Sequence, residues 1–537
     1  MSVTNPYRAK RDAFREITDF IEGGECLFGK VLVLSGLRRT GKTTLIEQYV
    51  AESPYRDKCA FYTVENGDTI KDIKAAIRKD SEEDDVTVFF FDEITKAKDF
   101  VTNSAALADI YAKEGLRIVL SGTDTLGFYF AELGELAFRV EKVHTTHIPF
   151  AEHCRIFGER DIDDYIRFGG LMKEGANKSY VKNYEEALRY LDESVADNIA
   201  NSLDKAPNES NLDKLTKNEM RSVVEKLVEL YNGQFDKKVV REELTKASVT
   251  YPISKLDGLV DKALIRRMDS QRDELVREFL SEIHADETVK TEVSEAMVIW
   301  LGQYLREIGV LSTIEKRRYV KNEDSSWASM PKEHEYYIAQ PAIRYYHIKE
   351  AQKMIETSDF YSMLPNDAKE FVAATLEEQI LGLMTEQIVL FDTKKYLPHV
   401  NYEVCKPSFE INRHGQAKPK TYEYDMLVYN RQVKEYYAFE IKHSREAIPE
   451  QCESLAHPEL REIMDKNFHK RACACVLYLG NSFVTTDGVA YLNIADFLAA
   501  LDLCKNLESA VELLTRNLEV KDLAAEETHE KNITKKY

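Results

Sequence analysis

The sequence predicts a multidomain α/β protein, with an N-terminal parallel sheet that carries helices on both faces and a second α/β domain near the C-terminus. The chain has 537 residues, and a prior of about 150 residues per domain suggests three or four domains. β-like runs alternate with helix-length segments before residue 150, which is typical of a parallel sheet wound with helices. Two further β-like runs, joined by a hairpin-length link, lie between residues 418 and 444.

Composition narrows the class of protein. Hydrophobic residues make up 44% and charged residues 31% of the chain, as in globular proteins. No apolar run reaches about 18 residues, so we expect no membrane span. The eight cysteines are scattered without metal-ligand spacing, which predicts reduced thiols and a cytoplasmic protein. A formal charge of −20 argues against wholesale binding to polyanions but is compatible with a local basic surface.

The stretch KVLVLSGLRRTGKTTLIEQYV contains the most specific motif. An apolar β-like run enters a loop that matches G-x-x-x-x-G-K-[ST], and a helix follows. In such a loop, backbone N–H groups and the helix N-terminus bind phosphate oxygens, the lysine reaches the terminal phosphates and the hydroxyl binds Mg²⁺. The residues predicted to contact nucleotide here are Gly36, Arg38, Arg39, Thr40, Gly41, Lys42, Thr43 and Thr44.

A pair of acids follows on a second apolar run, VTVFFFDEIT. We expect Asp92 to hold Mg²⁺ together with Thr43, and Glu93 to act as the catalytic base that polarises the attacking water. A third run, LRIVLSGTDTLGF, ends in hydroxyl groups that include Thr123. These either sense a γ-phosphate or form an ordinary turn. The runs CAFYTVE and THIPF complete the five expected strands.

The middle of the chain is predicted to be helical. Residues 175–235 have periodic apolar positions, as in a packed bundle. The stretch KKVVREELTKASVTYPISKLDGLVDKALIRRM then predicts helix, turn, helix and a short strand, the shape of a winged helix-turn-helix. Its excess of basic residues is small, so contact with DNA and a structural role as a connector both stay open. The later EHEYYIAQPAIRYYHI predicts a strand and then a helix that begins at a proline.

A second cluster of charged residues lies in KPKTYEYDMLVYNRQVKEYYAFEIKHS. The first β-like run carries Asp425, and the second carries Glu440 and Lys442. Residues at i and i+2 of a strand point to the same face, and neighbouring strands lie about 4.8 Å apart. Same-face carboxylates on the two strands can therefore share one divalent ion. The sequence leaves three interpretations open, namely a metal-competent site, a degenerate relative of one and a plain hairpin with an ordinary Glu–Lys pair.

The N-terminal motifs resemble a known family. GLRRTGKTTL, FFFDEI, LSGTDTLGF, HTTHIPFAEH and DDYIRFGGLM together look like the bacterial and archaeal AAA-type ATPases related to the STAND class. The resemblance implies a P-loop NTPase domain and ATP with Mg²⁺ as ligands. It also implies that a helical lid starts near Pro149, Phe150 and Glu152, and that Gly169 and Gly170 belong to it.

The C-terminal pattern resembles the PD-(D/E)xK nucleases, whose fold is that of restriction endonucleases. That resemblance implies that Asp425 and Glu440 bind Mg²⁺, that Lys442 helps activate the attacking water, and that Glu386 on the upstream stretch EEQILGLMTEQIVLFDTKKY completes the metal shell. ACACVLYLG would supply another core strand. The catalytic residues expected over the whole chain are Glu93, Glu440 and Lys442, and the metal ligands are Thr43, Asp92, Glu386, Asp425 and Glu440.

These observations predict five segments. They are an ATPase domain at 1–150, a helical lid at 151–235, a winged-helix middle at 236–365, a nuclease-like domain at 366–510 and a charged tail at 511–537. The expected protein hydrolyses ATP and cuts DNA with Mg²⁺, and the resemblance implies a role in defence against foreign DNA and allows a homo-oligomer. One alternative is a non-cleaving, ATP-dependent regulatory or DNA-tethering switch with a degenerate nuclease fold. A third is a chaperone-like remodelling ATPase.

Overall fold

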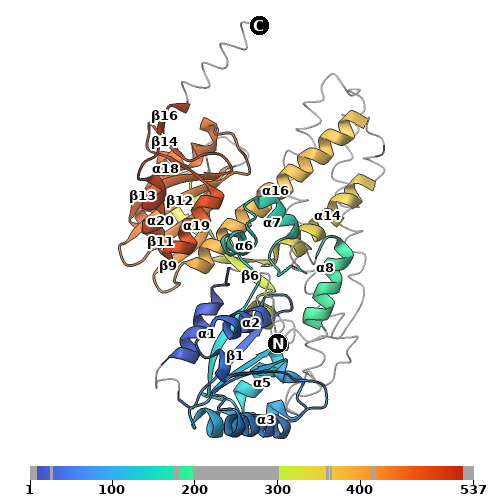
Figure 1. The fold of residues 1–537 in the computed structure, drawn as a ribbon. Coiled ribbons are helices and arrows are strands. Elements are labelled where there is room, and N and C mark those ends of the chain that lie inside the picture. Colours follow the sequence, from blue (N-terminus) through green and yellow to red (C-terminus); the bar gives the residue numbers. More distant parts are fainter. Residues whose placement is uncertain are drawn as a thin grey trace.

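The computed structural model describes residues 9–23, 28–173, 181–196, 302–357, 362, 366–412 and 419–523. The predicted winged helix-turn-helix within residues 236–272 lies outside them. The described residues form two separate sheets, with helices around and between them (Figure 1). The mixed α/β prediction is confirmed at this level.

The N-terminal sheet is parallel throughout, in the order β2-β3-β4-β1-β5. Its strands are β1 (Val31–Gly36), β2 (Cys59–Thr63), β3 (Val88–Asp92), β4 (Arg117–Gly122) and β5 (Val140–Thr145). Side chains alternate between the two faces of a strand. Leu32 and Leu34 of β1 therefore pack in one core with α1 (Ala13–Glu22) and α2 (Lys42–Glu52). Val31 and Val33 face the opposite core, which contains α3 (Ile70–Glu83), α4 (Phe100–Asn103) and α5 (Thr125–Leu133).

The fifth strand begins earlier than the sequence predicts. The expected run THIPF covers residues 146–150, but β5 ends at Thr145 and α6 (Phe150–Phe157) begins at the last residue of that run. β5 pairs with the whole length of β1, from Val31↔Val140 to Gly36↔Thr145. Pro149 has no N–H for a sheet ladder and lies instead at the cap of α6.

The second sheet has eleven strands among the described residues. Its main path runs β16-β14-β15-β13-β12-β11-β9-β6-β7, while β10 pairs with β9 and β8 pairs with β6. The strands are β6 (Leu311–Lys321), β7 (Trp327–Ser329), β8 (Glu333–Ile338), β9 (Tyr402–Ile411), β10 (Lys420–Glu423), β11 (Met426–Asn430), β12 (Glu435–Ile441), β13 (Lys470–Tyr478), β14 (Phe483–Thr485), β15 (Ala490–Asn493) and β16 (Val520–Lys521).

Helices flank this sheet. They are α14 (Pro341–Thr357), α16 (Asn366–Tyr396), α17 (Glu453–Ala456), α18 (Pro458–Phe468), α19 (Ile494–Cys504) and α20 (Leu507–Thr515). One helix and one strand of this region match elements that the sequence predicts. α14 begins at the proline that the sequence indicated, directly after β8. The predicted core strand ACACVLYLG is β13, which runs parallel to β12.

The sheet extends across the domain boundary that the sequence predicted at residue 366. β6 pairs in parallel with β9, from Lys316↔Lys406 to Lys321↔Ile411. β6, which lies inside the predicted middle segment 236–365, is therefore hydrogen-bonded to β9 of the predicted C-terminal domain. A parallel pair between strands so far apart in sequence leaves no local pattern, because each strand looks the same whichever neighbour it joins.

The expected tail is also shorter than predicted. Residue 511 lies inside α20, and Val520–Lys521 forms β16, which pairs with β14. The first part of the predicted charged tail therefore belongs to the C-terminal domain. Residues 524–537 lie outside the described part of the chain.

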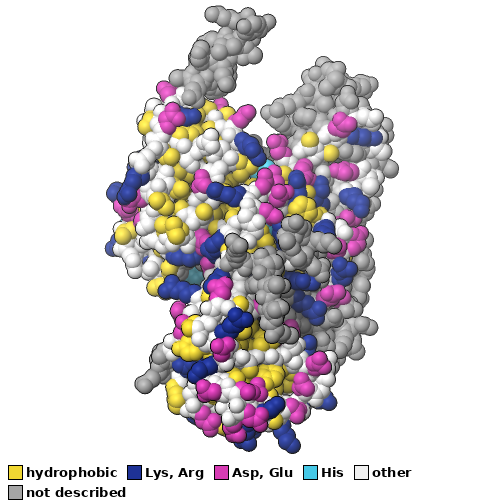
Figure 2. All heavy atoms as spheres, viewed as in Figure 1, with side chains coloured by type: hydrophobic (Ala, Val, Ile, Leu, Met, Phe, Trp, Pro, Cys, Tyr) yellow, Lys and Arg dark blue, Asp and Glu magenta, His cyan; other side chains and the backbone are white. Residues whose placement is uncertain are grey.

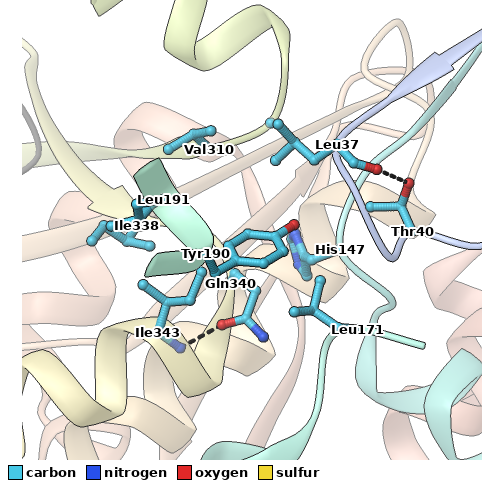
Figure 3. Close-up of a pocket in the computed structure, with 11 residues that line it drawn as sticks. Leu37, Thr40, His147, Leu171, Tyr190, Leu191, Val310, Ile338, Gln340 and Ile343 are labelled. Carbon is cyan, nitrogen blue, oxygen red and sulfur yellow. Dashed lines mark hydrogen bonds between the residues drawn. The ribbon is translucent and has the colours of Figure 1, made fainter. Parts of the chain in front are cut away.

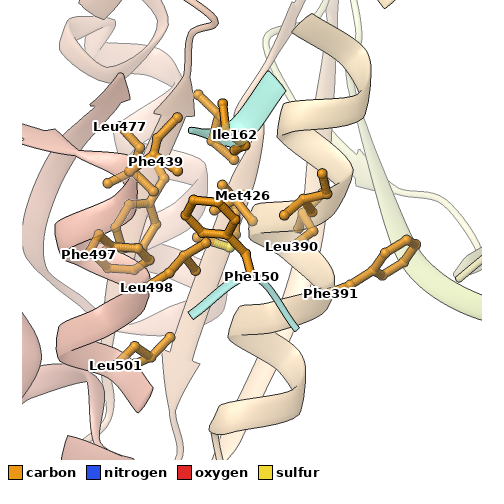
Figure 4. Close-up of a cluster of buried hydrophobic side chains, with 14 of the residues drawn as sticks. Phe150, Ile162, Leu390, Phe391, Met426, Phe439, Leu477, Phe497, Leu498 and Leu501 are labelled. Carbon is orange, nitrogen blue, oxygen red and sulfur yellow. The ribbon is translucent and has the colours of Figure 1, made fainter. Parts of the chain in front are cut away.

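The segment after β5 joins the core of the C-terminal domain. Phe150 of α6 is fully buried and makes a single cluster with residues of α16, α19 and the second sheet. Ile162 of α7 (Ile162–Phe168) belongs to the same cluster. Figure 4 shows Phe150 among Met426, Leu498 and Leu390, and Figure 1 shows α6 and α7 next to α16 at the side of the C-terminal domain. The predicted start of a helical lid is thus a packed connection between the two domains.

Candidate nucleotide and metal sites

The predicted phosphate loop requires glycine at both ends. Gly36 has φ of +146°, and a Cβ there would lie 2.2 Å from the Thr145 carbonyl oxygen. Gly41 has φ of +91° and caps α2, which begins at Lys42. Only glycine adopts such angles at no steric cost. The loop therefore leads directly into a helix N-terminus, the arrangement that binds phosphate.

Lys42 lies inside this loop. Its side chain is buried, and Nζ donates hydrogen bonds to the carbonyl oxygens of Gly36 and Leu37, both at 2.8 Å. Burial lowers the pKa of Lys42 to about 8, and the nearby Glu93 and Asp92 oppose that shift. The ammonium is thus held by weak neutral acceptors in a desolvated position, where phosphate oxygens would be stronger partners.

Asp92 and Glu93 accept hydrogen bonds from hydroxyl groups in α2 and at the end of β4. Thr43 Oγ1 donates to Asp92 Oδ2 at 2.9 Å, and Ser121 Oγ donates to Asp92 Oδ1 at 2.8 Å. Thr123 Oγ1 donates to Glu93 Oε2 at 3.2 Å. The carboxyl ends of β1, β3 and β4 therefore converge, as parallel neighbours must. The structure brings together Lys42, Thr43, Asp92, Glu93 and Thr123.

Arg38 and Arg39 of the loop contact the chain that follows Gly169 and Gly170. The Arg39 carbonyl accepts from Met172 N at 2.8 Å, and the Arg38 carbonyl accepts from the Tyr190 hydroxyl of α8 (Tyr184–Leu191) at 2.8 Å. Thr40 Oγ1 donates to the Leu37 carbonyl at 2.8 Å. Thr44 lies in the first turn of α2. Two backbone carbonyl groups of the loop are thus hydrogen-bonded to the predicted lid.

A small pocket lies beside the loop but not at its phosphate-binding side. Its lining combines the loop, α8 and the segment from β8 to α14, and is largely apolar. Figure 3 shows Tyr190 lying among Leu171, Ile343 and His147 in this pocket. Lys42, Thr43 and Asp92 are not part of the lining. We therefore place the candidate nucleotide site at these three residues and not in the pocket.

Arg11 contacts the phosphate loop, although no sequence motif indicates it. It is 6% exposed, and its guanidinium forms a bidentate pair with Glu152, at 2.9 Å to Oε1 and 3.1 Å to Oε2. Nη1 also donates to the Thr40 carbonyl of the loop. The partners are 141 residues apart in sequence. Glu152 lies in the first turn of α6. The N–H of Phe150, in the same turn, donates to Asp392 Oδ2 of α16 at 2.7 Å.

Removing Arg11 is expected to destabilise the protein strongly. Loss of one partner of a buried ion pair leaves an uncompensated charge and costs about 3–5 kcal/mol. For a domain of this size that corresponds to a fall in Tm on the order of 10 °C. Thermal unfolding of Arg11→Met should show this fall, whereas the double variant with Glu152→Gln should recover much of it. The exposed Arg15→Met is the matched control, with an effect below about 1 kcal/mol. Equal effects of the single and double variants would contradict the pairing argument.

The C-terminal acids converge on one ammonium group. Asp425 lies in the break between β10 and β11, and Glu440 lies in β12. Lys442 Nζ donates to Asp425 Oδ2 at 3.0 Å and to Glu440 Oε2 at 2.6 Å. The antiparallel pairing of β11 with β12, from Met426↔Phe439 to Asn430↔Glu435, sets this register. The predicted same-face arrangement of the three residues is therefore present.

Burial and mutual repulsion make the two acids unequal. Burial, followed by the charge of Asp425, raises the pKa of Glu440 well above its usual value against the opposing effect of Lys442. Burial would also raise the pKa of Asp425, but Lys442 and a second lysine, Lys406, hold it below its usual value. Glu440 is 5% exposed, and its Oε1 is buried without a hydrogen-bond donor among the described residues. The site therefore contains an acceptor that a proton or a cation can satisfy.

Glu386 lies beside this pair but has another partner. It is on α16, and Lys406 Nζ of β9 donates to its Oε1 at 2.5 Å. Lys406 is also 3.0 Å from Glu423 Oε2. Sequence reasoning missed Lys406, since a lone lysine in YEVCKPSFEI carries no motif.

These donors suit magnesium held by few protein ligands. No group of three or more Asp, Glu, His or Cys side chains that could hold a metal occurs within the described ranges. Mg²⁺ is usually bound by one or two carboxylates, with waters and substrate phosphates in the other positions. Asp425 and Glu440 supply two carboxylates and the buried free acceptor Oε1. The site thus fits Mg²⁺ of that kind and does not fit a cage of three carboxylates.

His443, the residue after Lys442, contacts α7 (Ile162–Phe168). His443 Nε2 lies 2.7 Å from Asp163 Oδ1 of α7. The two residues are 280 positions apart in the sequence, so no local pattern indicates this contact. α7 therefore touches the end of the β12 site, and the chain that follows it reaches the phosphate loop at Met172.

The surface offers no large region of one charge sign on the side displayed in Figure 2. Lys and Arg side chains of the described residues alternate there with Asp and Glu. The described helices also include none that is long and apolar enough to cross a membrane.

One comparison with known proteins matches the N-terminal part of the chain. Residues 29–154 match the family model described as an AAA domain. No curated protein matches the chain. Among solved structures, one titled S. cerevisiae Hsp104-ADP complex is 14% identical, with 72% of this chain and 55% of that chain covered and a TM-score of 0.23. That TM-score does not indicate a shared overall fold, and the chain spans about half the length of that relative.

The family match contains every element of the nucleotide site except the lid contacts and Arg11. Residues 29–154 are therefore similar to AAA domains, and their parallel five-stranded sheet is typical of P-loop NTPases. The match ends at residue 154, before the second sheet.

Proposed function

We propose that this protein couples an ATP-hydrolysing AAA domain to a Mg²⁺-dependent nuclease domain that cuts DNA. One observation carries the second half of the proposal. Asp425 and Glu440, from adjacent parts of one sheet, bind the same ammonium group within 3.0 Å, so both carboxylates face one point. That convergence is what a shared ion requires.

Each residue of the C-terminal site has a role in this proposal. Asp425 and Glu440 would hold Mg²⁺. A bound Mg²⁺ lowers the pKa of a coordinated water and stabilises charge on a phosphate. Lys442 lies between the two acids, where its ammonium would neutralise charge that develops on the scissile phosphate. In the AAA domain, Lys42 and Thr43 would hold the phosphates and Mg²⁺ with Asp92, while Glu93 would polarise the attacking water.

A non-cleaving switch is the second candidate, and one observation favours it. Lys442 already neutralises both acids by direct ion pairs. A fold that had lost its metal would keep such pairs, because they prevent two buried like charges from facing one another. In that case the C-terminal domain would bind DNA or a partner without cutting.

The test is incubation of the intact protein with supercoiled and linear DNA. We expect nicking or linearisation in Mg²⁺, with and without ATP as separate arms, and none in EDTA. Phosphate release from ATP is measured in the same samples. Intact DNA in every Mg²⁺ arm, alongside active ATP hydrolysis, would favour the switch and exclude the nuclease. A matching RNA arm identifies the nucleic acid.

A further inference from the structure

Lys406, the second lysine of the C-terminal site, lies between two carboxylates, where a metal ion could otherwise bind. Lys406 is 7% exposed, on β9, which pairs with β6, β10 and β11. Its ammonium bridges Glu386 of α16 and Glu423 at the end of β10. Its charge also acts on Asp425, which links it to the neighbouring group formed with Lys442. Two carboxylates on either side of one buried cation are the arrangement that otherwise attracts a metal.

The charges of the cluster leave room for a single divalent ion. Four carboxylates meet two ammonium groups: Glu386, Glu423, Asp425 and Glu440 with Lys406 and Lys442. When all are ionised, the formal excess is two negative charges, which one divalent cation balances. A second such ion would lie close to Lys406, at a repulsive energy that is large in a buried site. The free acceptor Oε1 of Glu440 lies on the Lys442 side of the cluster.

We propose that Lys406 limits this site to one divalent ion by holding Glu386 and Glu423 away from it. The inference rests on the proposed metal-dependent function, since it concerns the same site. Lys406 is a positioning residue: it sets which carboxylates are available to the ion. Glu386, which the sequence resemblance assigned to the metal shell, is then a partner of Lys406 and not a ligand.

Counting bound Mn²⁺ tests this without any measurement of cleavage. The intact protein is titrated with Mn²⁺ in the absence of nucleotide, and free Mn²⁺ is read by electron paramagnetic resonance. Glu440→Gln provides the background, so that the difference counts ions at this site alone. We expect one ion for the natural sequence and two for Lys406→Met. Lys316→Met is the matched control, because Lys316 is the register partner of Lys406 on β6 and should leave the count at one.

Each outcome has a separate meaning. Two ions in the natural protein, or one in a folded Lys406→Met, would overturn the inference and leave the nuclease proposal standing. A count equal to that of Glu440→Gln would overturn both.

Glu386→Gln covers the case in which Lys406→Met does not fold. Lys406 keeps Glu423 in this variant, so the cluster loses only one of its four acids. We expect the Mn²⁺ count to remain one and the affinity to change less than about threefold. A hundredfold loss of affinity in Glu386→Gln would make Glu386 a ligand and overturn the inference.

Discussion

Replacing Lys42 with methionine is expected to reduce ATP hydrolysis by about 100- to 1,000-fold, the usual cost of removing one donor that stabilises transition-state charge. The ammonium is buried within the phosphate loop, and its hydrogen bonds within the described part of the chain go to two carbonyl oxygens. Methionine keeps most of the side-chain volume but none of the charge. Phosphate release at saturating ATP and Mg²⁺ measures the effect.

The fold should survive this change. Burial already lowers the pKa of Lys42 to about 8, so the folded protein gains little from the charge. Thermal unfolding of Lys42→Met should therefore resemble that of the natural sequence. Lys30→Met is the matched control, because Lys30 directly precedes β1 and its ammonium pairs with Glu141 in a half-exposed position. Turnover within threefold of the natural level in Lys42→Met would contradict the assignment of the nucleotide site.

The nucleotide site could be predicted from sequence because most of its geometry is local. Gly36, Gly41, Lys42 and Thr43 lie within eight residues, and the loop that joins them determines how the phosphates are held. The acids Asp92 and Glu93 needed only one further inference, that parallel strands end at the same edge of a sheet. Both steps follow from backbone rules that hold in any protein.

The contacts that link the sites could not be predicted in this way. Arg11 pairs with Glu152, and His443 with Asp163, across 141 and 280 residues. An ion pair has no period and no spacing, so a charged residue in the sequence does not indicate its partner. Lys406 illustrates the same limit, because a buried lysine reads like an exposed one until the strands on either side are placed.

The pairing of β6 with the C-terminal strands could not be predicted for a related reason. β6 joins β9 in parallel, and a parallel pair needs a long crossover that can contain many other elements. The two strands of a hairpin, such as β11 and β12, are neighbours in the sequence, so their pairing can be inferred. β6 and β9 are not neighbours in the sequence, so their pairing cannot. The core residue Phe150 was likewise assigned by resemblance to the start of a lid, whereas the structure packs it against the C-terminal domain.

Glu440→Gln is expected to reduce Mg²⁺-dependent DNA cleavage below detection while ATP hydrolysis stays unchanged. Glutamine fills the same space but removes one of the two carboxylate charges that face the shared point. It therefore weakens binding of a divalent ion, which depends on charge. Cleavage of supercoiled DNA and phosphate release, measured on the same protein sample, separate the two activities.

The stability of this variant distinguishes a catalytic role from a structural one. Burial raises the pKa of Glu440, so the ionised carboxylate costs folding free energy at neutral pH, and that cost is present above the pKa of the unfolded chain. Glutamine removes the cost, and Lys442 keeps Asp425 as a partner. Thermal unfolding should therefore occur at the same or a higher temperature. Glu435→Gln, on the same strand in a surface pair with Lys470, should change neither cleavage nor stability. Full cleavage by Glu440→Gln would exclude this residue from the chemistry. A lower Tm together with lost cleavage would instead make the Glu440–Lys442 pair a structural element of the sheet.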